Sequence, residues 1–219
     1  AIAVMGRNMN TGKIEVIYGK KLQASDDSFG EARLIRDLYN RFECDYLVHD
    51  YTGAGNQRES FLVQAGIPSE RLWPVKFVPP TRGPAVRCVL GTIQHPRVVW
   101  HVEKTRCIQI TCAGIKADKI NFFKNDYKGE DDPGIIADFL SLVEHKIQTI
   151  RAGETYTIRR DPNRSDDFAM SVSMGAVAIW HINQCWPDFG VDMDNEDGAL
   201  ARDAQDYEDV LAEIADSIS

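Results

Sequence analysis

The segment 166–183 constrains the fold of this chain more than any other. It begins with two adjacent acids, Asp166 and Asp167, and its following turns are almost entirely small or apolar. A helix that is apolar on all sides has to be buried, so we expect this one to pack against a sheet. Its first turn, with the two acids, is then brought to the sheet instead of to open solvent. Acids at a helix start are also favoured by the helix dipole whatever their role.

The rest of the chain alternates short β-prone runs with helically spaced apolar residues. Strands are predicted over 1–5 and 13–18 as a hairpin, and over 46–49, 72–78, 98–102, 119–123 and 155–159. Helices are predicted over 29–42, 57–65, 105–117, 132–147 and 166–183. Residues 79–95, rich in Pro and Gly, are predicted as a loop excursion. This order indicates a mixed α/β sandwich rather than a barrel or a bundle.

The net charge of -8 is distributed unevenly along the 219 residues. Residues 188–219 contain 11 acids and one base, whereas residues 1–187 contain 24 bases and 22 acids. Within this body, 82–128 carries nine bases and three acids. We therefore predict one mildly basic domain over 1–187 and an acidic tail over 188–219, with apolar residues spaced for one helix. The overall acidity alone does not exclude a nucleic-acid partner.

Cysteine usage and hydropathy bear on the compartment. The five cysteines form no C-x-x-C motif and mostly stand in apolar runs, which is typical of a reduced intracellular protein with buried thiols. No apolar run approaches the roughly 20 residues that span a bilayer, and no signal peptide is recognisable. The chain enters a strand-like run directly at Ala1, from which we expect a fragment of a longer polypeptide.

Besides Asp166 and Asp167, Asp50 stands at a position where a binding or catalytic acid is expected. It ends the most apolar predicted strand and is followed by the small residues of 51–55. In open α/β sheets, ligands bind at the carboxyl ends of strands, so an acid at this place suits a metal ion. The alternative is a strand-end Asp that caps the next helix. Arg58 breaks a G-x-G-x-x-G pattern, and no phosphate-binding loop is present.

Two stretches carry a resemblance to a known family. They are YLVHDYTGAGNQ at 46–57 and SDDFAMSVSMGAVAI at 165–179. Their order and separation resemble the C-terminal nuclease domain of phage large terminase subunits, which has a ribonuclease H-like fold. The resemblance covers roughly residues 1–186. It implies an α/β fold with a mixed central sheet flanked by helices, with the basic excursion and the acidic tail as additions.

The activity implied by this resemblance is metal-dependent cleavage of double-stranded, concatemeric viral DNA during genome packaging. In the family, three or four carboxylates hold two Mg²⁺ or Mn²⁺ ions. Such hard cations take oxygen ligands, and an ion pair can activate the attacking water and stabilise the leaving 3′ oxygen. By transfer, Asp50 is the strand acid and Asp167 the helix acid. Asp166 is an auxiliary metal ligand or a cap.

The sequence departs from the family pattern at one catalytic position. The family's first acid lies on a first strand, just upstream of the segment matched by residues 1–5, and it is missing here. Glu15, on the second arm of the hairpin, is the nearest acid and a poor substitute. We therefore expect the domain to lack its first strand, or the copy to be an incomplete nuclease.

The resemblance also implies partners: double-stranded DNA, a portal protein, a small terminase subunit and an ATPase domain upstream in the same polypeptide. It implies the host cell cytoplasm as the location, with no membrane partner. Bases that neutralise phosphates without reading sequence are the candidate DNA contacts. They are Arg82, Arg87, Arg97, Lys104, Arg106, Lys116, Lys119, Arg159, Arg160 and Arg164.

Two other hypotheses stay open at this point. The first is a non-catalytic DNA- or portal-docking module that keeps the fold without the full set of carboxylates. The second is another ribonuclease H-like nuclease, such as a resolvase. The acidic tail suggests a restraint on the activity: it could lie across the basic excursion and compete with DNA, or it could dock on a portal or motor partner.

Overall fold

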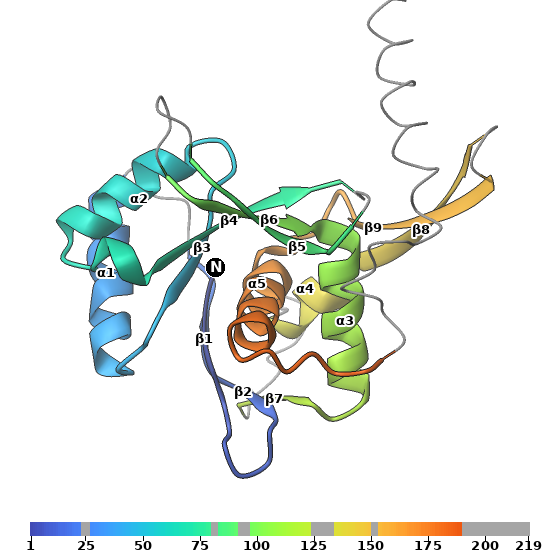
Figure 1. Ribbon diagram of the computed structural model, residues 1–219, viewed down its shortest axis with the longest axis horizontal. Helices are drawn as coiled ribbons and strands as arrows, with labels where there is room; N and C mark the ends of the chain where they lie inside the picture. Colours follow the sequence, from blue (N-terminus) through green and yellow to red (C-terminus); the bar gives the residue numbers. More distant parts are fainter. Residues whose placement is uncertain (23–26, 80–82, 92–96, 124–133, 150–152, 190–219) are drawn as a thin grey trace, which may run out of the picture.

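The structure is a computed structural model that describes residues 1–22, 27–79, 83–91, 97–123, 134–149 and 153–189 (Figure 1). Its strands are β1 (Ile2–Arg7), β2 (Ile14–Lys20), β3 (Leu47–Asp50), β4 (Leu72–Val78), β5 (Val86–Val89), β6 (Val99–Glu103), β7 (Ile120–Phe122), β8 (Leu142–Thr149) and β9 (Gly153–Arg160). Its helices are α1 (Ser28–Arg41), α2 (Gly55–Gln64), η1 (Ser69–Arg71), α3 (Lys104–Lys116), α4 (Ile136–Leu140) and α5 (Asp167–Ile182).

The strands form mixed sheets. β1 pairs antiparallel with β2, and β2 pairs parallel with β7. In the second sheet the order is β3-β4-β6-β5, where β3, β4 and β6 are parallel and β5 is antiparallel. β8 and β9 form an antiparallel hairpin that projects from the body (Figure 1). The predicted mixed α/β architecture is confirmed at this level.

Helix α5 lies at the centre of the main core, as its apolar sequence predicts. Phe168, Val172, Ala176 and Val177 are fully buried in a cluster with residues of β2, β4, β6 and α3. The helix packs against β1, β3 and α3. It begins at Asp167 because Pro162 and the turn around Asn163 keep the preceding chain out of a helix.

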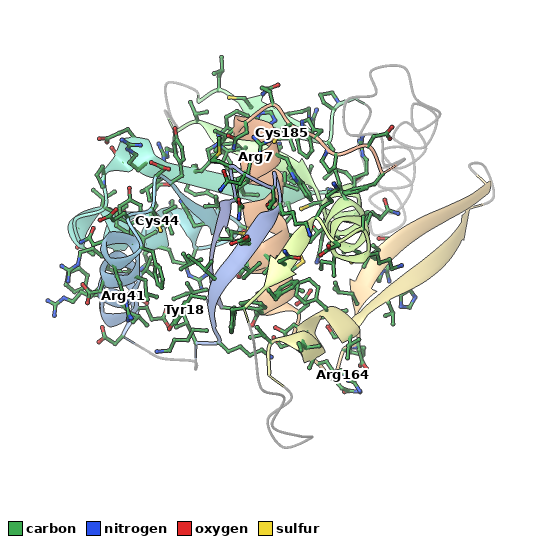
Figure 2. The ribbon with its side chains drawn as sticks, turned by 90° about the horizontal axis from the view of Figure 1, so that it is seen from below. Arg7, Tyr18, Arg41, Cys44, Arg164 and Cys185 are labelled. Atoms are coloured by element: carbon green, nitrogen blue, oxygen red, sulfur yellow. The ribbon has the colours of Figure 1, made fainter. Side chains whose placement is uncertain are left out.

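Helices α1 and α2 cover the opposite face of β3 and β4. Ala32 of α1 and Leu62 of α2 are buried with Leu72 of β4, whereas the next residue, Trp73, belongs to the main core. Neighbouring residues of one strand therefore face two different apolar layers, which explains the nearly continuous apolar sequence of this strand. Figure 2, seen from below, shows α1 near the hairpin, where Tyr18 of β2 contacts Phe42 after α1.

Two predicted elements are wrong. The helix predicted over 132–147 is described only from residue 134, and its helical part is the short α4, followed by β8. Val143 and Ile147 fit a helical spacing, but residues 142–149 pair with 153–160, and this long-range pairing decides the local conformation. The excursion over 79–95 also contains β5, which pairs with β6.

Candidate catalytic cleft

The carboxyl ends of β3, β4 and β6 point to the start of α5. These strands are parallel, so their ends share one edge of the sheet. Lys104 directly follows β6, and its Nζ lies 4.0 Å from the Asp166 carboxylate at the start of α5. Asp50, the last residue of β3, therefore belongs to the same edge. A single cleft is lined by Asp50, Lys104, Asp166 and Asp167.

Asp50 is half-buried at the end of β3. Its Oδ1 accepts a hydrogen bond of 2.8 Å from the Thr52 amide, which turns the chain away from the sheet. The residue at the N-cap position of α2 is Ala54, which makes no side-chain cap. The alternative of Asp50 as the cap of the next helix is therefore wrong.

The two acids at the start of α5 differ in their surroundings. Asp167 is exposed, and its amide donates to the Ser165 hydroxyl at 3.3 Å. Asp166 is buried, and its carboxylate lies 4.0 Å from both Lys104 Nζ and Arg160 Nη1. Asp166 occupies the N-cap position but makes no side-chain cap, so that part of its prediction is wrong.

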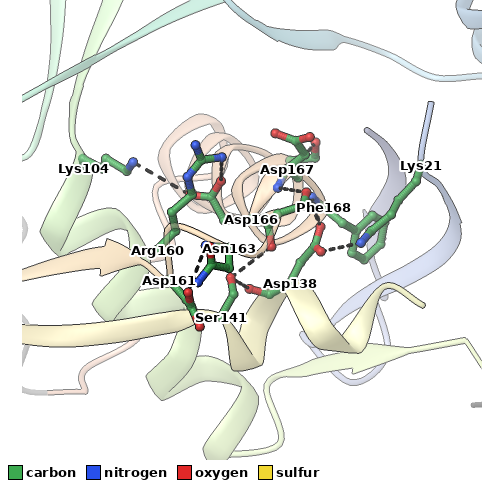
Figure 3. A network of polar contacts seen from close by, with 12 residues as sticks. Lys21, Lys104, Asp138, Ser141, Arg160, Asp161, Asn163, Asp166, Asp167 and Phe168 are labelled. Carbon is green, nitrogen blue, oxygen red and sulfur yellow. Dashed lines mark hydrogen bonds and ion pairs between the residues drawn. The ribbon is translucent and has the colours of Figure 1, made fainter. Parts of the chain in front are cut away.

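Asp138 of α4 caps α5 instead (Figure 3). Its Oδ2 accepts the Phe168 amide at 2.8 Å, and its Oδ1 pairs with the Lys21 ammonium. The Asp138 carboxylate is almost completely buried. Its backbone carbonyl accepts the Ser141 hydroxyl, which also lies 3.0 Å from the Ser165 carbonyl. This network fixes the backbone that carries Asp166 and Asp167.

Sequence reasoning missed Asp138 and Lys21. Asp138 lies more than 20 residues before α5 in the chain, and Lys21 lies more than 100 residues away. The one available signal was an acid enclosed by an apolar run, Ile135 to Leu140, because acids are rarely buried without a partner.

Two of the predicted DNA contacts lie beside the acids: Lys104, which lines the cleft, and Arg160 at the end of β9, with side chains 42% and 55% exposed. Arg159 is also exposed on β9, and exposed Arg164 is paired with Asp161 at 3.7 Å. Sequence reasoning also missed Arg58 of α2, which is exposed and lines the same cleft.

None of the other predicted contacts in the described ranges lines the cleft. Arg106 is buried and bound to Glu103 at 2.8 Å and to the Gly83 carbonyl, so it holds the loop before β5. Arg97 bonds the Leu72 carbonyl at the amino end of β4, at the opposite edge of the sheet. Exposed Lys116 and Lys119 lie at and beyond the far end of α3, and half-buried Arg87 lies on β5. Arg82 lies outside the described residues.

Glu15, the nearest acid to the missing one in the sequence, lines the same cleft, but on the side of the hairpin turn. It stands on β2 opposite Gly6, next to the hairpin turn, and accepts a 2.8 Å hydrogen bond from the Asn8 amide group. β1 leads to this turn from Ala1, whose carbonyl accepts the Ser171 hydroxyl in the first turns of α5. Glu15 is therefore separated by the length of β1 from the edge that carries Asp167.

A second polar cluster lies between β3 and α2. Glu59 accepts from His49 at 3.0 Å and pairs with Arg97 Nε at 2.8 Å, with a side chain only 14% exposed. Burial acts to raise the pKa of Glu59, but the His49 hydrogen bond and the Arg97 charge outweigh it, so the pKa lies below its usual value. This cluster ties α2 and the segment before β6 to β3.

Within the described ranges, no group of three or more His, Cys, Asp or Glu side chains is close enough to hold a metal ion. Of the acids that line the cleft, Asp50 lies at the end of β3 and the Asp166–Asp167 pair at the start of α5, and those that line it elsewhere are Glu15, Glu31, Glu43 and Asp45. Carboxylate oxygens are the donors that Mg²⁺ and Mn²⁺ prefer, so the donor chemistry fits while the number of ligands is small.

The cysteines are free thiols, of which Cys107 is buried and Cys88 is exposed. The expectation of buried thiols therefore holds for Cys107 and is wrong for Cys88. Among the described helices, none has the length and apolarity needed to cross a membrane. The acidic tail predicted over 188–219 lies outside the described residues from 190 onward.

Comparisons with protein-family models, with curated proteins and with solved structures find no match for this chain.

Proposed function

We propose that this chain is the nuclease part of a DNA-packaging enzyme, a divalent-metal-dependent endonuclease of ribonuclease H-like fold that cuts double-stranded DNA. One observation carries the proposal: Asp50 and Asp167, from distant parts of the sequence, line one cleft at the carboxyl edge of a sheet. These are the two acids singled out by the resemblance to large terminase subunits. The sheet and its flanking helices are compatible with that fold.

Asp50 and Asp167 would hold the metal ions in this proposal, and Asp166 would act through its position beside them. Two bound ions supply an activated water and stabilise the leaving 3′ oxygen. Lys104 and Arg160 lie next to Asp166 and would neutralise phosphates of the duplex. The described residues contain no group of three His, Cys, Asp or Glu side chains close enough to hold a metal ion, so the proposal requires a further carboxylate ligand.

The catalytic part of the proposal is tested with the chain preceded by a first strand that bears an aspartate. We expect this polypeptide to nick supercoiled plasmid in Mn²⁺, and we expect Asp50→Asn and Asp167→Asn each to reduce nicking to background. Asp37→Asn is the matched control, because Asp37 is exposed on α1 and pairs with the neighbouring Arg36. Unchanged nicking by Asp50→Asn would overturn the assignment.

The DNA-binding part is tested separately on a short duplex. We expect the double variant Lys104→Ala/Arg160→Ala to bind the duplex more weakly. Its affinity should also depend less on salt, with the magnitude of the slope of log K against log salt smaller by about 2. Lys116→Ala is the control, because Lys116 ends α3 roughly 18 Å from Lys104 at 1.5 Å per residue. If Lys116→Ala lost as much DNA affinity as the double variant, the edge of the cleft would not be the DNA-binding surface.

A second candidate function is a docking module that binds DNA or a portal protein without cutting. The observation that favours it is the same lack of a three-ligand group among the described residues. Duplex binding together with no nicking in Mn²⁺, even with the aspartate-bearing strand, would support it over the nuclease.

A further inference from the structure

Three neighbouring strands, β4, β6 and β5, each carry one basic residue in a single row across the sheet. Lys76 of β4 stands opposite His101 of β6, and His101 stands opposite Arg87 of β5. Neighbouring strands are about 4.8 Å apart, so these residues, called the basic row below, span about 10 Å. Of the three, only Arg87 is among the DNA contacts predicted from the sequence.

The basic row lies on the face of the sheet that points away from α5. Paired residues point to the same face, and successive residues of a strand point to opposite faces. Val102, the residue after His101, is buried in the main core, and so is its partner Val86, the residue before Arg87. The row therefore points outward, where Lys76 is exposed and the other two residues are half-buried. Figure 1 shows α3 and α5 on the opposite side of β5 and β6.

The basic row has no acidic partner among the described residues. Nearby bases are paired, Arg97 with Glu59 and Arg106 with Glu103. Within the described ranges, by contrast, no side chain of the basic row makes an ion pair or a side-chain hydrogen bond. Like charges on neighbouring strands destabilise a sheet. The row is therefore unfavourable for the fold by itself, and an anion bound across it would remove the repulsion.

The imidazole of His101 lies between the two cations of the row. Burial lowers the pKa of His101 below its usual value, and the charges of Lys76 and Arg87 lower it further. His101 is consequently largely neutral near pH 7 in the free chain. An anion bound between the two cations would oppose their effect and raise the pKa of His101. The imidazole therefore reports whether the row is occupied.

The basic row begins beside Asp50, at the acid-bearing edge of the sheet. Asp50 is paired with Val75, and Lys76 is the next residue of β4. The Tyr51 amide donates to the Val75 carbonyl at 2.7 Å, which holds the chain after Asp50 beside Lys76. From this point the row runs away from β3, across β6 to β5. An extended polyanion that crosses the edge at Asp50 therefore meets the row within one strand spacing.

We propose that the basic row is a second contact for the phosphate backbone of duplex DNA, beside the cleft and separate from Lys104 and Arg160. Lys76 and Arg87 neutralise phosphates without reading bases, and the imidazole N–H of His101 donates to a phosphate oxygen between them. The inference rests on the proposed function, because it takes DNA as the polyanion that crosses the acid-bearing edge.

The first measurement is the binding of a fluorescent duplex to the full chain, followed by anisotropy at several salt concentrations. We expect Lys76→Gln/Arg87→Gln to bind about tenfold more weakly at low salt, with the magnitude of the slope of log K against log salt smaller by about 2. The matched control is Lys116→Gln/Lys119→Gln, which removes two exposed bases at and beyond the far end of α3 and should leave both quantities unchanged. The urea midpoint of the row variant should not fall, because the substitutions remove a repulsion.

The second measurement is an NMR titration of the His101 ring protons in the original chain, with and without the duplex. We expect the bound duplex to raise the pKa of His101 above its value in the free chain. His101→Asn identifies the signal, because its ring protons are then missing from the spectrum.

The outcomes separate this inference from the proposed function. Full duplex affinity of Lys76→Gln/Arg87→Gln, together with weaker binding by Lys104→Ala/Arg160→Ala, would overturn the basic row and leave the proposed function in place. An original chain that binds no duplex at all would overturn both. If the duplex left the pKa of His101 unchanged while deletion of residues 188–219 lowered it, the acidic tail would be the occupant and the inference would be wrong.

Discussion

At the scale of single residues, the buried carboxylate of Asp138 stabilises the start of α5 more than Asp166 or Asp167 does. It is the acceptor for the first turn of α5 and the partner of Lys21, and its side chain is 1% exposed. Asp166 and Asp167 stand at the same helix start but make no cap. The amide of Phe168 in the first turn of α5 is thus capped by Asp138, an acid outside the motif.

Asp138→Ala should lower the free energy of unfolding by about 2–3 kcal/mol, because the Phe168 amide loses its buried acceptor and Lys21 loses its counter-charge. Urea unfolding followed by circular dichroism measures this loss. Asp37→Ala, at an exposed site on α1, should change the stability by less than about 0.5 kcal/mol. A loss at Asp138 no larger than this control would show that the cap does not support α5.

Glu59 makes the stability depend on pH. Its pKa is lowered in the folded chain, so its contribution is present above the unfolded pKa of about 4.3 and is lost as the pH falls through the folded value. Glu59→Gln should therefore be less stable than the original chain near pH 7 and approach it near about pH 3. Unfolding midpoints of both proteins measured across this pH range test this prediction. A difference in stability between the two proteins that does not change with pH would contradict it.

At the scale of elements, α3 and α5 pack closely because Gly114 allows it. A Cβ built on Gly114 would lie 3.1 Å from both Trp180 of α5 and Ile120 of β7. Trp180 is 4% exposed and contacts Trp186 and Phe189 beyond the helix. The close approach explains why an otherwise unfavourable glycine stands inside α3.

Gly114→Val should destabilise the fold by about 1–3 kcal/mol through overpacking against Trp180 and Ile120. Thermal unfolding and the near-ultraviolet signal of the tryptophans report it. Gly6→Val on β1 is the control, since a Cβ there meets nothing within 4 Å. If both variants unfold at the same temperature, close packing at Gly114 is not the reason for the glycine.

Element prediction failed where pairing partners decide the conformation. Val143 and Ile147 allow a helix, but β8 pairs with β9 along its whole length. β5 is only four residues long and is paired through Val86 and Val89 with β6. Short apolar runs are ambiguous between helix and strand, and the partner strand is what resolves them.

At the scale of the whole molecule, charge is divided between the body and the tail. Residues 188–219 account for more than the entire net charge of -8, which leaves residues 1–187 slightly basic. The exposed bases Lys104, Arg159 and Arg160 lie at or near the acid-bearing edge. A highly charged tail of the opposite sign can compete with DNA for such a surface.

Deletion of residues 188–219 should raise the affinity for duplex DNA at low salt, and the gain should shrink as salt screens the tail. Fluorescence anisotropy with a labelled duplex at several salt concentrations measures this. A chain in which the acids of 192–216 are changed to Asn and Gln separates charge from length. Equal affinity of all three proteins at low salt would show that the tail does not compete.

The sequence by itself determined the burial of α5, the strand end at Asp50 and the mixed α/β class, because apolar periodicity and helix-start acids are local properties of the chain. It also singled out Asp50 and Asp167 as a pair through the resemblance. Only the tertiary structure decided that Asp138 caps α5, that Arg106 binds Glu103 and the Gly83 carbonyl and Arg97 binds Glu59, and that β1 and β3 line one cleft. Those facts depend on contacts between residues far apart in the chain, and burial and pairing at such distances leave no periodic signal in the sequence.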